Sequence, residues 1–467
     1  MKKYKHIIQN IYYTLSSNLL SFFVSTIITL LLPKLLGVAD YGYYQLYLFY
    51  TSYVGLLHFG WCDGIYLRYS GKKYDDLNKE LFRGQYLSLF LMEIILSLLI
   101  LISLYFSNIS DYNKLLVLYG TIFNIILQNM RTFSLFVLQA TNRMKAYSRI
   151  IIFDRLIFVS ISIVLIFFRL DSFWIYMCID IFAKIISLIV SVYKIDDIIV
   201  DPIKIKWSFY ESKENIKTGI NLTLANIASI LIIGIVRLGI QDNWDVETFG
   251  KVSLSLSVSN MLMLFINAIS LAIFPLIKRQ TEESYKKSYK MIRVILMPTA
   301  LILLMMYYPV KIFLLHWLPD YEESLNYMGI IFPMIVFESK VSLLTNTFLK
   351  AMRQEKAILV INILSLGVSV VLTGIMVYVL NNLFMTMIAI VFILGFRSII
   401  SELVLSKILD VFVIKDILLE LIVISSFIFL NQNYSINSSM IIYTAIILIY
   451  LYFKKSELIQ LIKAIKS

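Results

Sequence analysis

Charged side chains inside long apolar stretches are the residues of this chain whose types could do chemistry. The basic ones are Arg131, Arg155, Lys184, Arg237, Lys340 and Arg397. The acidic ones are Glu93, Asp154, Asp180, Glu338 and Glu402. A cation at the centre of a hydrocarbon layer costs roughly 2.5–3.5 kcal/mol. Each deeply placed charge therefore needs a partner or a water-filled cavity.

Arg131 and Arg397 are the best candidates for unpaired cations in such a cavity. Neither has an acid one helical turn away on its own stretch. A guanidinium fork also suits bidentate binding of phosphate oxygens. The alternative for each is an ion pair with an acid on another helix. Near the ends of their stretches lie four further charges that can extend to an interface: Asp154, Arg155, Arg237 and Glu402.

Two closely spaced acid–base sets have different geometries. Asp180 and Lys184 are one helical turn apart and can pair with each other. That pair is either structural or one that an anionic substrate rearranges. Glu338 and Lys340 are two residues apart and point roughly 200° away from one another on a helix, so they cannot neutralise each other directly.

The composition places these charges in a membrane. Of 467 residues 59% are hydrophobic and 15% are charged, whereas soluble domains carry roughly 25% charged residues. Mean hydropathy is +0.81. We therefore expect an all-α, polytopic membrane protein with about fourteen transmembrane helices. The spans are expected near 11–33, 43–65, 85–107, 115–138, 150–168, 173–193, 218–240, 252–277, 291–308, 327–349, 358–380, 383–405, 417–431 and 439–453.

Lysine and arginine concentrate in alternate segments between the spans, and acidic residues in the others. The positive-inside rule then places both termini in the cytoplasm. The same rule explains most of the net charge of +12, so nucleic acid is not an expected partner.

The segment 194–217 is the longest inside loop and divides the chain. We expect a six-helix lobe over 1–200, a second over 201–410 and an additional helix pair with a basic tail over 411–467. The lobes are pseudo-symmetric, because Asp40-Tyr41-Gly42 aligns with Thr248-Phe249-Gly250 at an offset of 208. Parallel repeats of this kind suggest a substrate path between them.

Several chemistries lack their residue patterns. The chain has no G-x-x-x-x-G-K-[S/T] loop for nucleotide phosphates. His6, His58 and His316 are scattered, so we expect no metal site and no cofactor. Cys62 and Cys178 are interpreted as small core residues.

The segment Leu35-Leu36-Gly37-Val38-Ala39-Asp40-Tyr41-Gly42 and the later Phe59-Gly60 with Arg68 resemble the Wzx-type polysaccharide flippases. These belong to the multidrug/oligosaccharidyl-lipid/polysaccharide exporter (MOP) superfamily. The resemblance extends over the whole chain in length, number of spans and duplication. It implies a V-shaped bundle whose central cavity opens alternately to either side of the membrane. It also implies an undecaprenyl-diphosphate-linked oligosaccharide as the cargo.

We therefore expect a flippase for surface polysaccharide precursors (capsule, O-antigen or exopolysaccharide), and no enzyme. The luminal cations expected to bind the diphosphate are Arg131, Lys184, Lys340 and Arg397, with Arg155, Arg237 and Arg68 as secondary candidates. Asp180, Glu338 and Glu93 are candidates for coupling to an H⁺ or Na⁺ gradient. Expected partners are membrane lipids and the polymerase and glycosyltransferases of the same pathway.

Three alternatives remain open from the sequence. A drug or cation antiporter of the same superfamily would favour net acid in the lumen, which the charges inside the spans disfavour. A peptidoglycan-precursor flippase of the same superfamily is the second alternative. A membrane-integral polymerase or acyltransferase is a different class. A polymerase would need a larger outer loop than 309–326, and an acyltransferase a buried histidine, for which His58 is the candidate.

Overall fold

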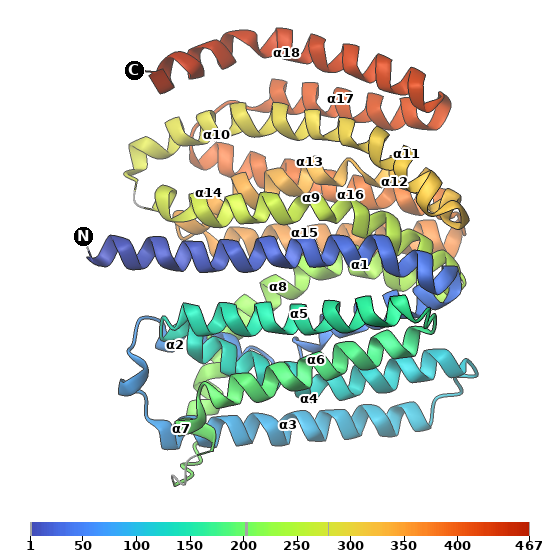
Figure 1. The fold of residues 1–467 in the computed structure, drawn as a ribbon. Coiled ribbons are helices and arrows are strands. Elements are labelled where there is room, and N and C mark those ends of the chain that lie inside the picture. Colours follow the sequence, from blue (N-terminus) through green and yellow to red (C-terminus); the bar gives the residue numbers. More distant parts are fainter. Residues whose placement is uncertain (1, 201–203, 279, 467) are drawn as a thin grey trace. The chain divides into compact units, whose positions relative to one another are not determined.

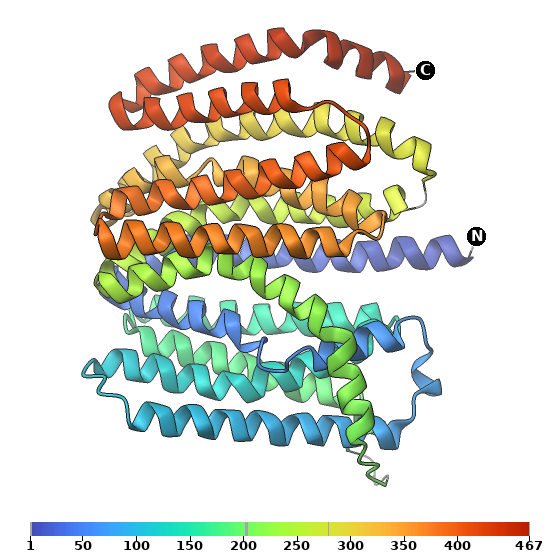
Figure 2. The ribbon, with the colours of Figure 1, turned by 180° about the vertical axis from the view of Figure 1, so that it is seen from behind.

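The computed structural model describes residues 2–200, 204–278 and 280–466, and these residues form helices joined by turns and short loops, without a strand (Figures 1 and 2). The chain divides into two compact units, Met1–Ile227 and Ala228–Ser467. Each unit is described by itself. The predicted lobe boundary after residue 200 falls at 201–203, which lie outside the described residues.

In unit 1 most of the helices pack against α4 (Tyr112–Ala140). Its helices are α1 (Lys2–Val54), α2 (Trp61–Tyr69), α3 (Lys79–Tyr105), α4 (Tyr112–Ala140), α5 (Met144–Phe167), α6 (Phe173–Tyr193), α7 (Asp196–Ile199) and the first part of α8 (Phe209–Asn243), with a 3₁₀ turn at Tyr74–Asp76. Helix α4 packs against α1, α2, α3 and α6, while α5 packs against α1 and α6. Figure 1 shows α3 lying alongside α4.

Unit 2 repeats much of this arrangement. Its helices are the rest of α8, α9 (Val246–Lys278), α10 (Glu282–Leu303), α11 (Tyr307–Trp317), α12 (Glu322–Ile331), α13 (Met334–Ser339), α14 (Asn346–Ala351), α15 (Glu355–Thr373), α16 (Leu383–Ile408), α17 (Ile414–Asn433) and α18 (Ile436–Lys466). Segments of π-helix, η4 (Lys340–Thr345) and η5 (Gly374–Val379), follow α13 and α15. Helix α12 packs on α9 and α16, as α4 packs on α1 and α6, and α15 packs on α16, as α5 packs on α6. These contacts are similar in the two units, and the expected duplication into six-helix lobes stays a prediction.

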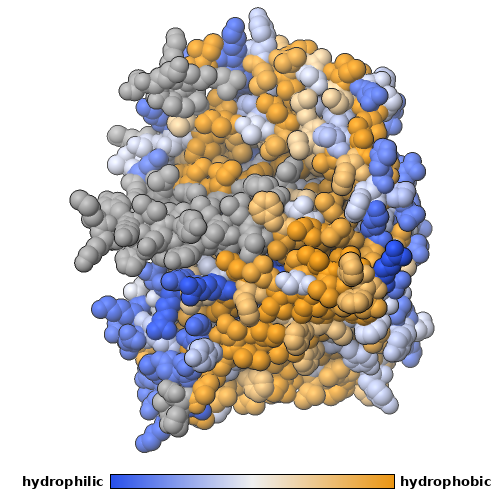
Figure 3. Space-filling view, in the orientation of Figure 1, coloured by the Kyte–Doolittle hydropathy of each residue, from blue (hydrophilic) through white to orange (hydrophobic). Residues whose placement is uncertain are grey.

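The chain is an all-α, multi-pass membrane protein. Among the described residues, nine helices are long and apolar enough to cross a membrane, or ten if the bent pair Pro319–Ile331 and Met334–Ala351 is one span. This is fewer than the fourteen spans expected, although each expected span has helical residues at its position. The first two expected spans lie largely in α1, which contains a non-helical residue at Gly37. Figure 3 shows hydrophobic side chains along the middle of the helices and hydrophilic ones toward their ends.

The second expected span, 43–65, is interrupted. Helix α1 ends at Val54 and α2 begins at Trp61, and the turn between them has positive φ at Phe59 (49°) and Gly60 (86°). A close backbone contact accompanies the break, because a Cβ on Gly219 of α8 would lie 2.0 Å from the Gly60 carbonyl oxygen. Glycine at position 60 permits the left-handed backbone, and glycine at position 219 permits the close approach.

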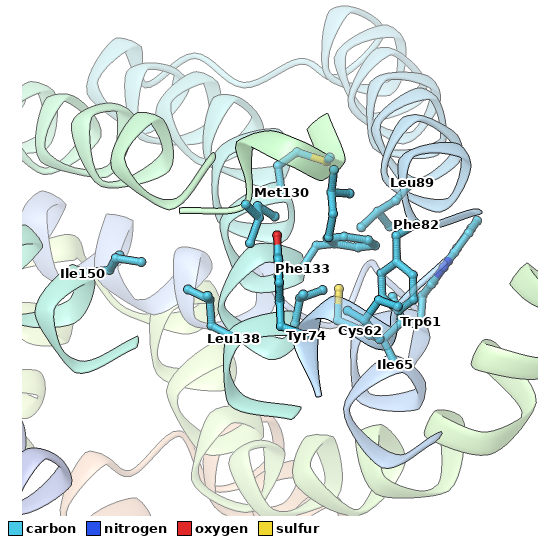
Figure 4. Close-up of a cluster of buried hydrophobic side chains, with 14 residues drawn as sticks. Trp61, Cys62, Ile65, Tyr74, Phe82, Leu89, Met130, Phe133, Leu138 and Ile150 are labelled. Carbon is cyan, nitrogen blue, oxygen red and sulfur yellow. The ribbon is translucent and has the colours of Figure 1, made fainter. Parts of the chain in front are cut away.

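The core of unit 1 lies where α2, α3 and α4 meet. Figure 4 shows Cys62, Phe82, Met130 and Phe133 in one buried cluster, with Trp61 at its edge. The prediction that Cys62 is a small core residue is confirmed. For Cys178 the same prediction is wrong, because its side of α6 is exposed. An exposed apolar side chain on a membrane helix can face hydrocarbon.

Candidate functional site

The predicted Asp180–Lys184 pair forms in α6 and is part of a polar network between three helices. Lys184 Nζ lies 2.6 Å from Asp180 Oδ2 and donates to Asn124 Oδ1 of α4 at 3.0 Å. The hydroxyl of Tyr47 of α1 donates to Asp180 at 2.5 Å and accepts from Asn124 at 2.8 Å. Asn124 and Tyr47 are fully buried. Both charges are therefore satisfied inside unit 1.

Arg131 does not lack a partner, contrary to the expectation for this residue. Its guanidinium on α4 lies 3.2 Å from the Asp154 carboxylate on α5. Asp154 is buried and faces its neighbouring helix, whereas the sequence suggested that it extends to an interface. The pair is the interhelical alternative that the sequence left open. Such a pair needs good geometry to offset the desolvation of both charges.

Arg155, in contrast to Arg131, is an exposed cation without an ion pair among the described residues. Helix α5 runs Met144–Phe167, so Arg155 lies midway along it and not near an end, as the sequence suggested. Its side chain is exposed and makes no ion pair or hydrogen bond with any residue that the structure describes. It is close enough to Asp180 and Tyr44 to act on them electrostatically. An exposed cation midway along a span requires water or an anion beside it.

Glu93 of α3 is an isolated acid in unit 1. It is fully buried, and neither carboxylate oxygen makes a hydrogen bond in the described structure. Its polar neighbour is Asn129 of α4, and Cys62 is also near. A charged carboxylate in this position carries an uncompensated desolvation cost, so proton uptake is the chemistry that this position favours.

In unit 2 the other predicted free cation, Arg397, is also paired, so the expectation is wrong for this residue as well. From α16 its guanidinium contacts Glu338 Oε1 of α13 at 3.1 Å. It also donates to Asn362 of α15 at 3.1 Å and to Ser229 of α8 at 2.9 Å. Arg397 is buried, while the side chain of Glu338 is 20% exposed. The Glu338 carboxylate of this pair is thus partly accessible, whereas the guanidinium is not.

Lys340 lies in a second, larger network that is closed. Its ammonium contacts Glu402 of α16 at 2.6 Å and Glu420 of α17 at 2.5 Å. Arg293 of α10 contacts the same two carboxylates, at 2.6 Å and 2.7 Å. All four side chains are at most 6% exposed. Lys340 is therefore occupied by two carboxylates and has no face left for a phosphate in this conformation.

The network also ties the C-terminal helix pair to the rest of unit 2. Arg293 reaches Asp416 of α17 at 3.1 Å, and Lys454 of α18 reaches the same carboxylate at 2.5 Å. Figures 1 and 2 show α18, α17 and α10 side by side. The sequence reasoning missed Arg293 and Glu420, although both fall inside expected spans, 291–308 and 417–431. It also placed Glu402 near an interface, which is wrong, because Glu402 is fully buried in the network.

The two secondary candidates Arg237 and Arg68 have local roles. Arg237 of α8 donates to Ser253 at 2.9 Å, and its guanidinium lies 5.0 Å from the ring centre of Phe249. Arg68 of α2 contacts Glu211 at 2.7 Å and donates to Asn215 at 2.6 Å. Arg68 thus fixes the end of α2 to the start of α8 inside unit 1.

A further ion cluster lies at the basic end of unit 1. Asp197 of α7 contacts Lys79 Nζ at 2.6 Å and accepts a hydrogen bond from the Tyr74 hydroxyl. The Arg143 guanidinium lies 3.4 Å from the ring centre of Tyr74. Partial burial raises the pKa of Asp197, but the hydrogen bonds from Lys79 and Tyr74 outweigh it and hold that pKa below 3.8. The cluster joins three interhelical loops.

The buried His58 belongs to the turn before α2. Its Nδ1 accepts from the Gly60 amide at 3.1 Å, and its Nε2 is 3.9 Å from Asp63. Asp63 in turn accepts from the Thr223 hydroxyl at 2.5 Å. These contacts give His58 a place in holding the interrupted span.

The fold is that of MOP superfamily transporters. The lipid II flippase MurJ in an inward closed conformation aligns with a TM-score of 0.64 and 14% identity, over 97% of this chain and 100% of that one. An inward-facing multidrug resistance MATE family transporter aligns with a TM-score of 0.59 and 10% identity, over 88% and 98%. A MOP superfamily transporter from Pyrococcus furiosus aligns with a TM-score of 0.51 and 11% identity, over 86% and 95%. At these identities the likeness concerns the fold alone.

A comparison of the sequence with family profiles identifies the family of the chain. Residues 7–241, half of the chain, match the profile of a family described as polysaccharide biosynthesis proteins. The chain belongs to this family, and the resemblance to Wzx-type flippases drawn from its motifs is confirmed at that level. Among curated proteins no sequence matches the chain.

Proposed function

We propose that the chain is an alternating-access flippase, and not an enzyme, that moves an undecaprenyl-diphosphate-linked oligosaccharide across the bacterial cytoplasmic membrane. Its product would serve the synthesis of a surface polysaccharide. The family match supports the pathway, and the MOP fold supports transport. Both termini would lie in the cytoplasm, as the distribution of lysine and arginine predicts.

The observation that carries an anionic cargo is Arg155. It is an exposed cation midway along α5, without an ion pair or hydrogen bond in the described part of the chain. Hydrocarbon would make this position costly, whereas a water-filled path and a passing diphosphate make it favourable. Arg155, a secondary candidate from the sequence, therefore becomes the first candidate for diphosphate capture, because Arg131, Arg397 and Lys340 already hold carboxylates.

The paired cations Lys184 and Arg397 could couple cargo binding to the binding of an ion. Lys184 and Arg397 each hold a carboxylate that is not fully enclosed: the Asp180 side chain is 12% exposed and that of Glu338 is 20% exposed. A diphosphate that approaches either pair would compete with the carboxylate for the same cation. Such exchange would release Asp180 or Glu338 to take up a coupling cation. Glu93, buried without a hydrogen bond, is the candidate for a proton.

Energetics favour the outward direction. Across a membrane with an inside-negative potential, outward movement of negative charge gains ~2.3 kcal/mol per charge per 100 mV. The proposed coupling ion would then serve the return of the empty carrier. The glycosyltransferases of the pathway would supply the cargo, and the polymerase would consume it.

Transport in proteoliposomes tests the proposal. Purified protein is reconstituted with a fluorescent undecaprenyl-diphosphate oligosaccharide, and the fraction that becomes accessible to a membrane-impermeant quencher is followed over time. We expect scrambling of the diphosphate lipid well above that of protein-free vesicles, and no uptake of a cationic dye such as ethidium. Ethidium transport without movement of the diphosphate lipid would instead identify an antiporter.

A further inference from the structure

A cavity of about 660 Å³ lies in unit 1, and neither Arg155 nor the Asp180–Lys184 pair of the same unit is among its lining residues. It is formed by α2, α3 and the segment that leads into α8, and its volume lies in the range of small-ligand pockets. Large apolar side chains make up most of its wall: Trp61, Met92, Trp207, Phe209 and Ile216. The polar residues of the wall are serines and two lysines.

The wall is held in place by Gln85, which is 2% exposed. Its amide nitrogen donates to the Ser208 carbonyl and to the Ser212 hydroxyl, each at 3.2 Å. Its amide oxygen accepts from the Trp61 indole at 2.9 Å and from Asn215 at 3.3 Å. One buried side chain thus joins α2, α3 and α8 around the cavity.

The segment before α8 rests directly on the backbone of α3. The Lys206 amide donates to the Glu80 carbonyl at 3.2 Å. A Cβ on Gly84 would lie 2.2 Å from the Lys206 carbonyl oxygen, so a larger residue there would lift the segment. The cavity is therefore a built feature of unit 1.

Lys213 and Lys217 are the charged side chains of the wall. They are one helical turn apart on α8, both are exposed, and neither makes an ion pair or hydrogen bond with the residues that the structure describes. Like charges at this spacing repel one another. An anion between them would remove that repulsion, and no acid among the residues of the wall supplies one.

The surroundings are those of a membrane interface. Trp207, Phe209 and Tyr210 are 55%, 85% and 68% exposed and lie next to the two lysines in the sequence. Exposed aromatic side chains mixed with lysines are typical of the headgroup region of a membrane. The positive-inside rule assigns this end of α8 to the inner leaflet, whose anionic lipids attract such clusters.

We propose that this cavity binds an anionic phospholipid of the inner leaflet. The phosphate lies between Lys213 and Lys217, and one acyl chain lies along Met92 and Ile216. The apolar wall suits an acyl chain and offers few partners to a sugar, which disfavours the oligosaccharide cargo as the occupant. The site does not depend on what the protein transports.

Tryptophan quenching by brominated lipids tests the site on the full-length protein. Trp61 and Trp207 line the cavity, so the other three tryptophans are replaced by phenylalanine at Trp174, Trp244 and Trp317. Phosphatidylglycerol and phosphatidylcholine, each brominated on the acyl chain, are compared at equal mole fraction. We expect phosphatidylglycerol to quench at a lower mole fraction, by roughly tenfold or more.

Two variants separate charge from cavity. K213Q/K217Q should remove the preference for phosphatidylglycerol, while K72Q/K73Q, two exposed lysines of unit 1 outside the cavity, should retain it. Ser88→Phe, which fills the cavity without adding a tryptophan, should reduce the quenching by both lipids. Equal quenching by both lipids in the parent, or an unchanged preference in K213Q/K217Q, would overturn the proposal. Displacement of phosphatidylglycerol by undecaprenyl diphosphate would also overturn it, because the site would then belong to the cargo.

Discussion

Lys340→Met should strongly destabilise unit 2. Lys340 contacts Glu402 at 2.6 Å and Glu420 at 2.5 Å, and its side chain is 4% exposed. At an effective dielectric constant of 20 each attraction is worth about 6 kcal/mol, much of which offsets the desolvation of the ions. Methionine fits a similar volume but leaves two buried carboxylates with Arg293 as their shared cation. Removal of one partner from such a buried network costs about 3–5 kcal/mol.

Thermal unfolding of the purified protein in detergent measures this loss. For a unit of this size about 1 kcal/mol corresponds to about 2–4 °C, so we expect Tm to fall by roughly 10 °C. Glu420→Gln in the Lys340→Met background should recover part of the loss, with a coupling of about 1–3 kcal/mol. Lys286→Met is the matched control, because its pair with Asp410 is largely exposed and worth at most about 1 kcal/mol.

Two results would refute the structural role of Lys340. The first is a Tm for Lys340→Met that matches that of Lys286→Met. The second is a Lys340→Met protein that unfolds at the parental temperature yet no longer transports, since this would return Lys340 to the cargo site where the sequence placed it.

The remaining predictions concern the stability of variants at Glu93, Gly219 and Asp197 of unit 1, with Gly367 of unit 2 as a control. Glu93→Gln should raise Tm at neutral pH, because it removes a buried carboxylate without a hydrogen bond; a large drop would show that the charge has a partner. Gly219→Ala should prevent stable folding, since its Cβ would lie 2.0 Å from a backbone oxygen. Gly367→Ala, with no atom within 4 Å, should fold normally, and equal yields in size-exclusion chromatography would contradict this. Because the pKa of Asp197 is lowered in the folded protein, its stabilisation is present above about pH 4 and is lost as pH falls further. The Tm advantage over Asp197→Asn should therefore vanish toward pH 3, and a constant advantage from pH 6 to 3 would contradict the shift.

The positions of the helices follow from hydrophobicity, because each span must satisfy its own backbone, but fourteen spans were expected and nine or ten of the described helices are long and apolar enough to cross. The interruption at 55–60 does not follow from hydrophobicity, since it coincides with a contact with Gly219, more than 150 residues away. Local sequence at Phe59-Gly60 shows that a turn is possible. It cannot show which helix packs against that glycine.

Most charges of the site were identified from the sequence, but Arg293 and Glu420 were missed, and the pairing was only partly predictable. Asp180 and Lys184 are near in sequence, so their pair was expected and is present. The partners of Arg131 and Arg397 lie on other helices, which a single sequence does not reveal. Arg155 was assigned to an interface because the start of its span was placed several residues too late.

The contribution of Arg155 to transport is most directly tested by the rate at which proteoliposomes move the fluorescent diphosphate lipid. Arg155→Gln should lower that rate by about tenfold or more, because the exposed cation midway along α5 is lost, and Arg155→Lys should retain part of it. Arg149→Gln, an exposed arginine near the start of the same helix, should transport at the parental rate. Equal rates for Arg155→Gln and Arg149→Gln, in proteins of equal Tm, would contradict diphosphate capture by Arg155.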